Sequence, residues 1–190
     1  MSSLSLFLRN YFRHPREIGA LAATSASYSK LACAQVEWQN VQHIAELGAG
    51  DGAVTKFIVQ NLLPHQKFLV FETNADLFAV LQERFKHHSN VVLIHDSAEY
   101  LEKYAHEQEI SHFDAIFSEV PLVSLPKDVG ENIVEAVLKM LKVGGKYLQI
   151  QYSLLSLSKL KKLFKSVSLK FTLFNLPPAF LYICSNIKSK

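Results

Sequence analysis

Three glycines at alternate positions carry the clearest chemical signal in the sequence. The apolar run at residues 43–47 leads into Gly48, Gly50 and Gly52, and an amphipathic segment begins directly after them. Glycine lets a backbone turn sharply and lie against a ligand with no side chain between the two. The start of the following helix adds unpaired N–H groups that can donate to that ligand. The order of strand, turn and helix therefore predicts a binding site for a nucleotide-like ligand.

Glu72 is the second residue in position to bind such a ligand. It comes 20 residues after the last glycine and directly after the apolar run at residues 67–71. A carboxylate at the end of this strand can accept hydrogen bonds from both hydroxyls of a ribose. Spacing alone leaves the ligand open, because Gly48-x-Gly50-x-x-Ala53 also fits the dinucleotide fingerprint. An NAD-binding oxidoreductase is therefore one alternative.

Glu46 separates the two kinds of cofactor. It lies two residues before the first glycine, where an acid would repel a pyrophosphate but would suit a cofactor that carries an amino group and a sulfonium. A chain of 190 residues also has no room for the separate domain that a hydride acceptor would need. Both features favour a sulfonium cofactor over NAD. A glycine-rich turn that binds no ligand is the remaining structural explanation.

These residues need a framework of strands and helices to hold them. From residue 40 to residue 151, short apolar runs alternate with longer segments of helical period, the pattern of a parallel sheet covered by helices on both faces. We expect strands at residues 43–47, 67–71, 91–94, 113–117 and 146–151, and further strands around residues 167–174 and 179–184. We expect helices at residues 51–61, 75–87, 131–141 and 154–164. Gly144-Gly145 should end the third helix, since glycine takes the left-handed C-cap conformation without strain.

Length and composition predict one α/β domain over residues 1–190, with a helical segment at residues 1–36 and the core at residues 37–190. The chain is 49% hydrophobic and 19% charged, which is typical of one globular domain. Its two cysteines, Cys33 and Cys184, form no CxxC pair, and no cluster has metal-ligand spacing, so we expect neither a disulfide framework nor a metal. The sequence shows neither a signal peptide nor a run of about 18 apolar residues. We expect a cytoplasmic protein that can lie peripherally at the inner membrane surface.

Charge is distributed unevenly along the chain. Residues 37–150 carry a net charge of −7, whereas residues 1–36 carry +3 and residues 151–190 contain seven lysines and no acid. Leu4, Phe7, Leu8, Tyr11 and Phe12 recur at helical spacing with two arginines towards the other side. Such a basic amphipathic helix can lie in an anionic membrane surface, or its apolar face can pack on the domain. For the lysine- and leucine-rich segment at residues 154–165 we expect packing on the sheet.

The segment at residues 46–52 resembles the E-x-G-x-G-x-G motif of class I S-adenosylmethionine-dependent methyltransferases. This resemblance implies a Rossmann-like, seven-stranded, mostly parallel sheet with an antiparallel last strand, and S-adenosylmethionine as the cofactor. Carried over position by position, it implies a catalytic pair, Ser118 and Pro121. It implies that the cofactor is bound by Glu46, Gly48, Ala49, Gly50, Gly52, Glu72, Thr73, Asp96, Ser97, Ala98 and Ser118.

A closer resemblance is to bacterial soluble-type phospholipid N-methyltransferases, which are often described as similar to rRNA adenine dimethylases. The similar segments are Phe7-Leu8-Arg9-Asn10, residues 14–20, residues 113–118 with Pro121-Leu122, and residues 175–179 with Tyr182. The resemblance implies that the acceptor is the amine of a phospholipid such as phosphatidylethanolamine. We expect the substrate to be bound by Tyr11, Asn175, Pro177 and Pro178. The family usually has glycine at the position of Glu119, and we expect this side chain to point to solvent rather than to attract a cationic amine.

Methyl transfer from a sulfonium needs a neutral lone pair held behind the methyl carbon, away from water. For an amine, the Ser118 hydroxyl can orient the N–H bonds; alternatively it caps the following turn. An RNA adenine methyltransferase would be expected to show Asn-x-Pro and an aromatic here, but Ser118 replaces the amide and Leu122 the aromatic. The missing ring costs a base roughly 1 to 3 kcal/mol of stacking. RNA therefore ranks below lipid, and a small-molecule acceptor and a non-catalytic scaffold stay open.

Overall fold

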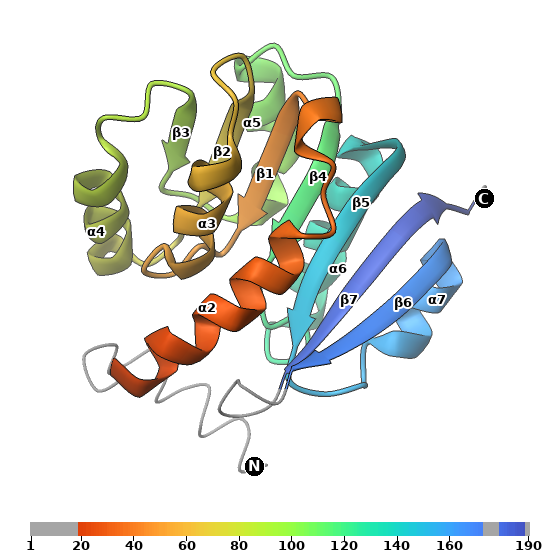
Figure 1. Cartoon of the computed structure of the whole chain (residues 1–190). Helices are drawn as coiled ribbons and strands as arrows, with labels where there is room; N and C mark the ends of the chain where they lie inside the picture. Colours follow the sequence, from red (N-terminus) through yellow and green to blue (C-terminus); the bar gives the residue numbers. More distant parts are fainter. Residues whose placement is uncertain (1–18, 173–178, 189–190) are drawn as a thin grey trace.

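The computed structural model describes residues 19–172 and 179–188 of the chain (Figure 1). Its helices are α2 (Gly19–Cys33), η2 (Trp38–Asn40), α3 (Ala53–Asn61), α4 (Ala75–Phe85), η3 (Ala98–Tyr100), α5 (Leu101–Glu107), α6 (Lys127–Met140) and α7 (Leu157–Leu163). Its strands are β1 (His43–Leu47), β2 (Lys67–Phe71), β3 (Val91–Ile94), β4 (Phe113–Ser118), β5 (Leu141–Gln151), β6 (Phe164–Thr172) and β7 (Ala179–Ile187). The expected helix at residues 4–13 and the expected substrate contacts of Tyr11, Asn175, Pro177 and Pro178 lie outside the described residues.

The seven strands form one sheet in the order β3-β2-β1-β4-β5-β7-β6 (Figure 1). β7 is antiparallel to both of its neighbours, and the other pairs are parallel. The prediction of a mostly parallel sheet with an antiparallel last strand is therefore confirmed. β1 lies between β2 and β4. The chain therefore adds β2 and β3 on one side of β1 and then crosses over to add β4 on the other side. Ligands of open α/β sheets bind at the carboxyl ends of the strands at such a switch point.

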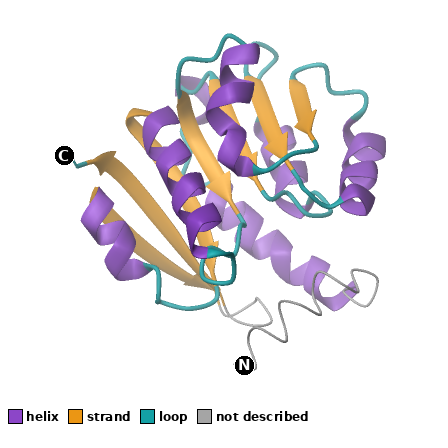
Figure 2. Cartoon of the chain, turned by 180° about the vertical axis from the view of Figure 1, so that it is seen from behind, coloured by secondary structure: helices purple, strands orange, loops and turns teal. Residues whose placement is uncertain are grey.

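Helices cover both faces of the sheet (Figure 2). One face packs on α5, α6 and α7 and the other on α2, α3 and α4, so the sheet separates two apolar cores. Successive residues of β2 alternate between them: Leu69 and Phe71 belong to the first core, Phe68 and Val70 to the second. A strand buried on both faces reads as a continuous apolar run, which is how β2 appears in the sequence.

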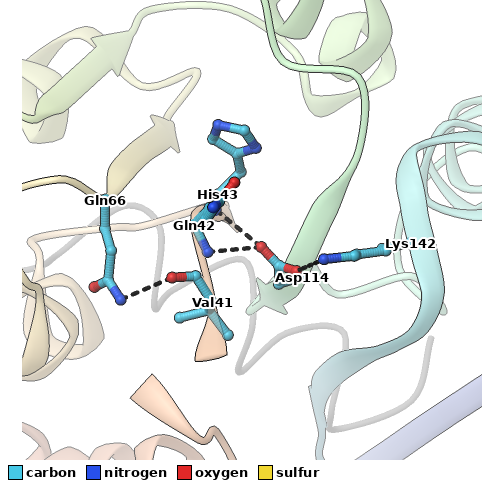
Figure 3. Close-up of polar contacts among 6 residues, drawn as sticks. All are labelled: Val41, Gln42, His43, Gln66, Asp114 and Lys142. Carbon is cyan, nitrogen blue, oxygen red and sulfur yellow. Dashed lines mark hydrogen bonds and ion pairs between the residues drawn. The ribbon is translucent and has the colours of Figure 1, made fainter. Parts of the chain in front are cut away.

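Polar contacts fasten the amino ends of the strands, at the sheet edge opposite the glycine turn (Figure 3). The Asp114 carboxylate accepts hydrogen bonds from the backbone N–H groups of Gln42, at 2.7 Å, and His43, at 3.0 Å. Lys142 Nζ pairs with its other oxygen at 2.6 Å. Burial raises the pKa of Asp114, but the bonds from Lys142 and the two backbone donors outweigh burial and hold this pKa below its usual value. Asp114 therefore connects the starts of β1, β4 and β5.

The expectation that Gly144-Gly145 ends a helix is wrong. α6 ends at Met140, and the next residue, Leu141, already has extended dihedral angles and pairs with Phe113 of β4. Gly144 does have a positive φ of 80°, but it lies within β5, where the register against β4 shifts. The glycine therefore relieves an irregularity in a strand, a role that the local sequence does not distinguish from a helix C-cap.

The leucines of α7 pack on the domain, as expected, but Leu154, which was expected in the same helix, precedes α7 and is exposed. Leu160 is buried, and Leu157 and Leu163 are partly buried against the core that α6 also covers. Within residues 19–172 and 179–188, no helix is both long and apolar enough to cross a membrane.

Candidate functional site

The glycine turn lies at the carboxyl end of β1. Its backbone is held to β2, because the N–H groups of Gly48 and Ala49 donate to the Phe71 carbonyl at 2.9 and 3.0 Å. Gly48, Gly50 and Gly52 have φ angles of 74°, 60° and 86°, a region that L side chains rarely adopt. The turn reverses the chain within five residues, and α3 starts directly after it.

The three glycines have different surroundings. A Cβ atom on Gly52 would lie 2.8 Å from the ring of Phe85, and one on Gly48 would lie 3.1 Å from Val120 Cγ2. A Cβ atom on Gly50 would have none of the described residues within 4 Å. Packing therefore explains the absence of a side chain at Gly48 and Gly52, whereas Gly50 borders open space in which a ligand can lie against the backbone.

Glu72 lies at the carboxyl end of β2 and reaches the glycine turn. Its Oε2 accepts a hydrogen bond from Gly50 N at 2.8 Å, and its Oε1 accepts one from Asn74 N at 2.7 Å. Asn74 in turn caps α4 by accepting from two backbone N–H groups. A carboxylate can accept about four hydrogen bonds, so Glu72 keeps acceptor capacity for a ligand beside Gly50. The neighbouring Thr73 is exposed.

Asp96, Ser97 and Ala98 follow β3 and so lie at the same edge of the sheet. The Asp96 carboxylate accepts hydrogen bonds from the Tyr104 hydroxyl at 2.8 Å and from Ser97 N at 2.7 Å. These two bonds, that of Tyr104 first, hold the pKa of Asp96 below its usual value. Ser97 caps the short helix η3, whose first residue, Ala98, is buried. The structure thus brings this segment next to Glu72 across β2 and β3.

Ser118 ends β4 and pairs with Leu47 at the end of β1. Its side chain is buried beside Tyr147: burial raises the pKa of the Tyr147 phenol, and the Ser118 hydroxyl opposes part of that rise. Within the described chain the Ser118 hydroxyl makes no hydrogen bond of ordinary geometry. It does not cap the turn that follows, so of the two roles expected for Ser118 only the positioning role stays a prediction.

Two side chains of β5 bind the backbone of the segment that follows Ser118. The Val120 carbonyl accepts hydrogen bonds from the side-chain amides of Gln149, at 3.0 Å, and Gln151, at 3.2 Å. Pro121 is partly buried, and its carbonyl accepts from Ser124 N at 2.8 Å. Both amides are buried, so the loop at Pro121 has a fixed path beside the glycine turn.

Two carboxyl side chains lie beside this turn, Glu46 fully buried and Glu119 partly buried. Glu46 is fully buried, and its Oε2 accepts a hydrogen bond from the Thr55 hydroxyl at 2.6 Å. Burial, and then the charge of Glu119, raise the pKa of Glu46 well above its usual value. Burial, and then Asp51 and Glu72, raise the pKa of Glu119 to about 8. Glu46 Oε1 and Glu119 Oε1 are both buried without a hydrogen-bond partner in the described chain. The expectation that Glu119 points to solvent is therefore wrong.

The geometry fits a cofactor that carries positive charge. Gly50 offers open space, Glu72 offers free acceptor positions, and Glu46 is a buried carboxylate with an unpartnered oxygen. Burying a carboxylate without a partner is costly, and a sulfonium or an ammonium group would reduce that cost. The described residues contain no group of three His, Cys, Asp or Glu side chains that could hold a metal ion.

Sequence reasoning missed some residues of the site. Thr55 could have been predicted from the sequence. It is a polar residue in the first turn of the helix after the glycines, where its side chain can reach back to Glu46. Tyr28 and Tyr152, which act electrostatically on Glu119, could not have been predicted in this way. They come from α2 and from the segment after β5, and only the tertiary structure brings them to the turn.

Residues 24–170 match the family model described as ribosomal RNA adenine dimethylase. An ornithine lipid N-methyltransferase from Singulisphaera acidiphila is 29% identical over 189 residues, which are 99% of this chain and 98% of that protein. The match to the family model spans most of the sheet and includes every described site residue named above.

Solved structures of the same fold include an rRNA methylase from Streptococcus thermophilus, at a TM-score of 0.64 and 17% identity over 85% of this chain and 95% of that one. Another is the N-methyltransferase NodS from Bradyrhizobium japonicum, at a TM-score of 0.69 and 14% identity over 87% and 97% of the two chains. NodS is also known in complex with S-adenosyl-L-homocysteine. The NAD alternative is therefore rejected. The chain belongs to the ribosomal RNA adenine dimethylase family and is an S-adenosylmethionine-dependent methyltransferase of the Rossmann-like class.

Proposed function

We propose that this enzyme N-methylates the amine headgroup of a membrane lipid such as phosphatidylethanolamine. The observation that carries the proposal is the 29% identity to an ornithine lipid N-methyltransferase along 99% of the chain. An ornithine lipid and phosphatidylethanolamine differ in backbone but share an exposed alkyl amine, so the common chemistry is methylation of that amine at a lipid surface.

When bound, S-adenosylmethionine supplies an electrophilic methyl group on its sulfonium. We assign the ribose to Glu72 with Thr73, the adenine side to Asp96, Ser97 and Ala98, and the amino-acid end to Glu46, Gly48, Ala49, Gly50 and Gly52. The Ser118 hydroxyl and the loop at Pro121 then orient the acceptor nitrogen. Holding the two reactants in line and out of water is the main contribution that such a site makes to the rate.

The surface around the site supports a lipid partner. β4, β5 and β6 are mutually parallel, so their carboxyl ends lie at the same sheet edge as the glycine turn. Large apolar side chains are exposed there: Val123 after β4, Leu154 and Leu155 after β5, and Phe171 near the end of β6. Leu155 is 71% exposed and Phe171 is 51% exposed. Lys170, also near the end of β6, is exposed, so this edge combines insertion into a bilayer with attraction to anionic lipid.

RNA adenine is the second candidate, and the match to the dimethylase family model favours it. The site itself favours it less. Ser118 stands where an amide would bind the base, and Leu122, where a ring would stack on the base, packs against the α6 side of the core. A basic surface serves either anion, because phosphate groups occur in both.

The decisive experiment is a radiolabelled methyl-transfer assay on the full-length enzyme. Vesicles containing phosphatidylethanolamine or ornithine lipid in an anionic background and structured ribosomal RNA are offered in parallel. We expect label in the amine lipid, and weaker attachment to the vesicles as salt is added, because salt screens the lysines. A Leu155→Ser and Phe171→Ser double variant should lose vesicle binding while keeping its affinity for S-adenosylmethionine. Label in RNA alone rejects the lipid proposal.

A further inference from the structure

Glu119 is held against the cofactor turn by its backbone. Its N–H group donates to the Leu47 carbonyl at 3.0 Å, which fixes the residue next to the end of β1. The following residue, Val120, is the nearest neighbour of Gly48: a Cβ on Gly48 would lie 3.1 Å from Val120 Cγ2 and 3.5 Å from Val120 N. Glu119 therefore lies directly beside the glycine turn, on the loop that carries Pro121.

Among residues 19–172 and 179–188, no cation pairs with the Glu119 carboxylate. Its Oε1 is buried without a hydrogen-bond partner in the described chain. None of the described groups that act on it electrostatically is cationic, although they come from five parts of the fold. They are Tyr28 on α2, Glu46 on β1, Asp51 in the turn, Glu72 after β2 and Tyr152 after β5. A carboxylate in such surroundings is stable only when it is protonated or when a cation comes to it.

The proposed acceptor is such a cation. Alkyl amines have pKa values of about 10, so a lipid amine reaches the enzyme as an ammonium ion. An ammonium ion has no lone pair and cannot attack a methyl group. An enzyme that methylates it must therefore both bind a cation and remove one of its protons.

We propose that the Glu119 carboxylate binds the ammonium form of the acceptor amine beside the glycine turn and takes the proton that the amine must lose before methyl transfer. This role rests on the proposed function, since it requires an amine as acceptor. Two tyrosines, Tyr28 and Tyr152, are close enough to act electrostatically on Glu119, and aromatic rings beside a carboxylate favour alkylammonium ions.

An N–H bond of the ammonium breaks and leaves its electron pair on nitrogen, while an O–H bond forms on Glu119. The nitrogen lone pair forms a bond to the methyl carbon as the carbon–sulfur bond breaks, and that electron pair stays on sulfur. The product is a methylated ammonium and a neutral thioether, and Glu119 then returns its proton to water.

Proton release on binding tests the role of Glu119 without turnover. The full-length enzyme is loaded with S-adenosyl-L-homocysteine and titrated at pH 7 with soluble short-chain phosphatidylethanolamine, in buffers of different ionisation enthalpy. Because the unliganded carboxyl has a pKa of about 8, we expect close to one proton to be released as the ammonium binds. E119Q should release none, and E119G, with the glycine of the similar proteins, serves if E119Q folds poorly. Glu135→Gln on α6, an exposed acid, should behave as the wild type.

Kinetics give a second readout. E119Q should lose roughly 100-fold or more in kcat/KM for the amine lipid, the usual contribution of a general base, with an unchanged KM for S-adenosylmethionine. The wild-type rate should rise with pH as Glu119 ionises, whereas the residual rate of E119Q should rise only as the amine itself loses its proton.

Three results would overturn the assignment. If E119Q methylates the lipid at the wild-type rate, Glu119 is not the proton acceptor. If the proton is instead released when S-adenosyl-L-homocysteine binds, and E119Q abolishes that release, the carboxylate serves the cofactor. If the wild type neither binds nor methylates any amine lipid, the proposed function fails and this role fails with it.

Discussion

Replacing Glu119 by glutamine should change how the stability of the ligand-free enzyme depends on pH. The pKa of Glu119 is about 8 in the folded protein and has a reference value of 4.5. Folding therefore favours the protonated carboxyl. The stability gained from this is fully present below the unfolded pKa and is lost as the pH rises through the folded pKa.

The magnitude follows from the number of protons bound in each state. Between pH 5 and pH 7 the folded protein keeps one proton on Glu119 that the unfolded chain has lost, so the free energy of unfolding falls by about 1.4 kcal/mol per pH unit. Over these two units the wild type should lose about 2.5 kcal/mol relative to E119Q, which has no titrating group there. The charge of Glu119 raises the pKa of Glu46, but Glu119 is mostly uncharged up to pH 7, so most of the contribution of Glu46 is common to the two proteins over this range.

Urea unfolding of both proteins at pH 5, 6 and 7 measures this difference. The single tryptophan, Trp38, reports on the transition, because it stacks on Phe117 of β4 with ring centroids 6.3 Å apart. A pH-independent cost of the new amide would shift the E119Q curve equally at each pH and would leave the slope intact. Equal slopes for the two proteins would show that the Glu119 carboxyl is solvated and would refute the reasoning.

Four further substitutions test other parts of the structure. Gly50→Ala should keep the fold at a cost of about 1 to 2 kcal/mol, because alanine is strained at a φ of 60° although no described residue lies within 4 Å of the new methyl group, and it should weaken S-adenosylmethionine binding at least about tenfold in calorimetry. Gly52→Ala places its methyl group against Phe85 and should lower the unfolding free energy by about 1 to 3 kcal/mol. Glu72→Ala removes the proposed ribose acceptor and the partner of Gly50 N, so affinity should fall roughly tenfold or more; a loss smaller than threefold would assign the ribose elsewhere. Asp114→Asn should cost about 1.5 to 3 kcal/mol of stability and leave cofactor affinity unchanged, since it acts at the opposite sheet edge.

The elements around the glycine turn were predictable because their signals are local. β1, β2 and β3 occupy the residues expected from their apolar runs, since a strand buried on both faces must be apolar along its length. The order of strand, glycines, helix and acid also follows from sequence, because each residue acts within its own βα unit.

Features that depend on distant parts of the chain were not predictable. Whether Glu119 points to solvent or into the fold is decided by α2 and by the segment after β5, which bring Tyr28 and Tyr152 to it. The backbone at Gly144 is a second feature that depends on a distant part of the chain. Its positive φ was expected, but whether it follows a helix or interrupts a strand depends on the pairing of Leu141 with Phe113.

The placement of β7 has a consequence for synthesis of the chain. β7 (residues 179–187) lies between β5 and β6, and β6 joins the sheet only through it. During translation β6 and α7 emerge first and have no strand to pair with until β7 has been made. The growing chain can therefore pair β1 to β5, the strands around the cofactor site, early. β6, which carries Phe171, can join the sheet only after β7 has been made and has paired with β5. A chain whose synthesis ends before residue 179 would leave β5 with an exposed, unpaired edge, the kind of edge that promotes aggregation.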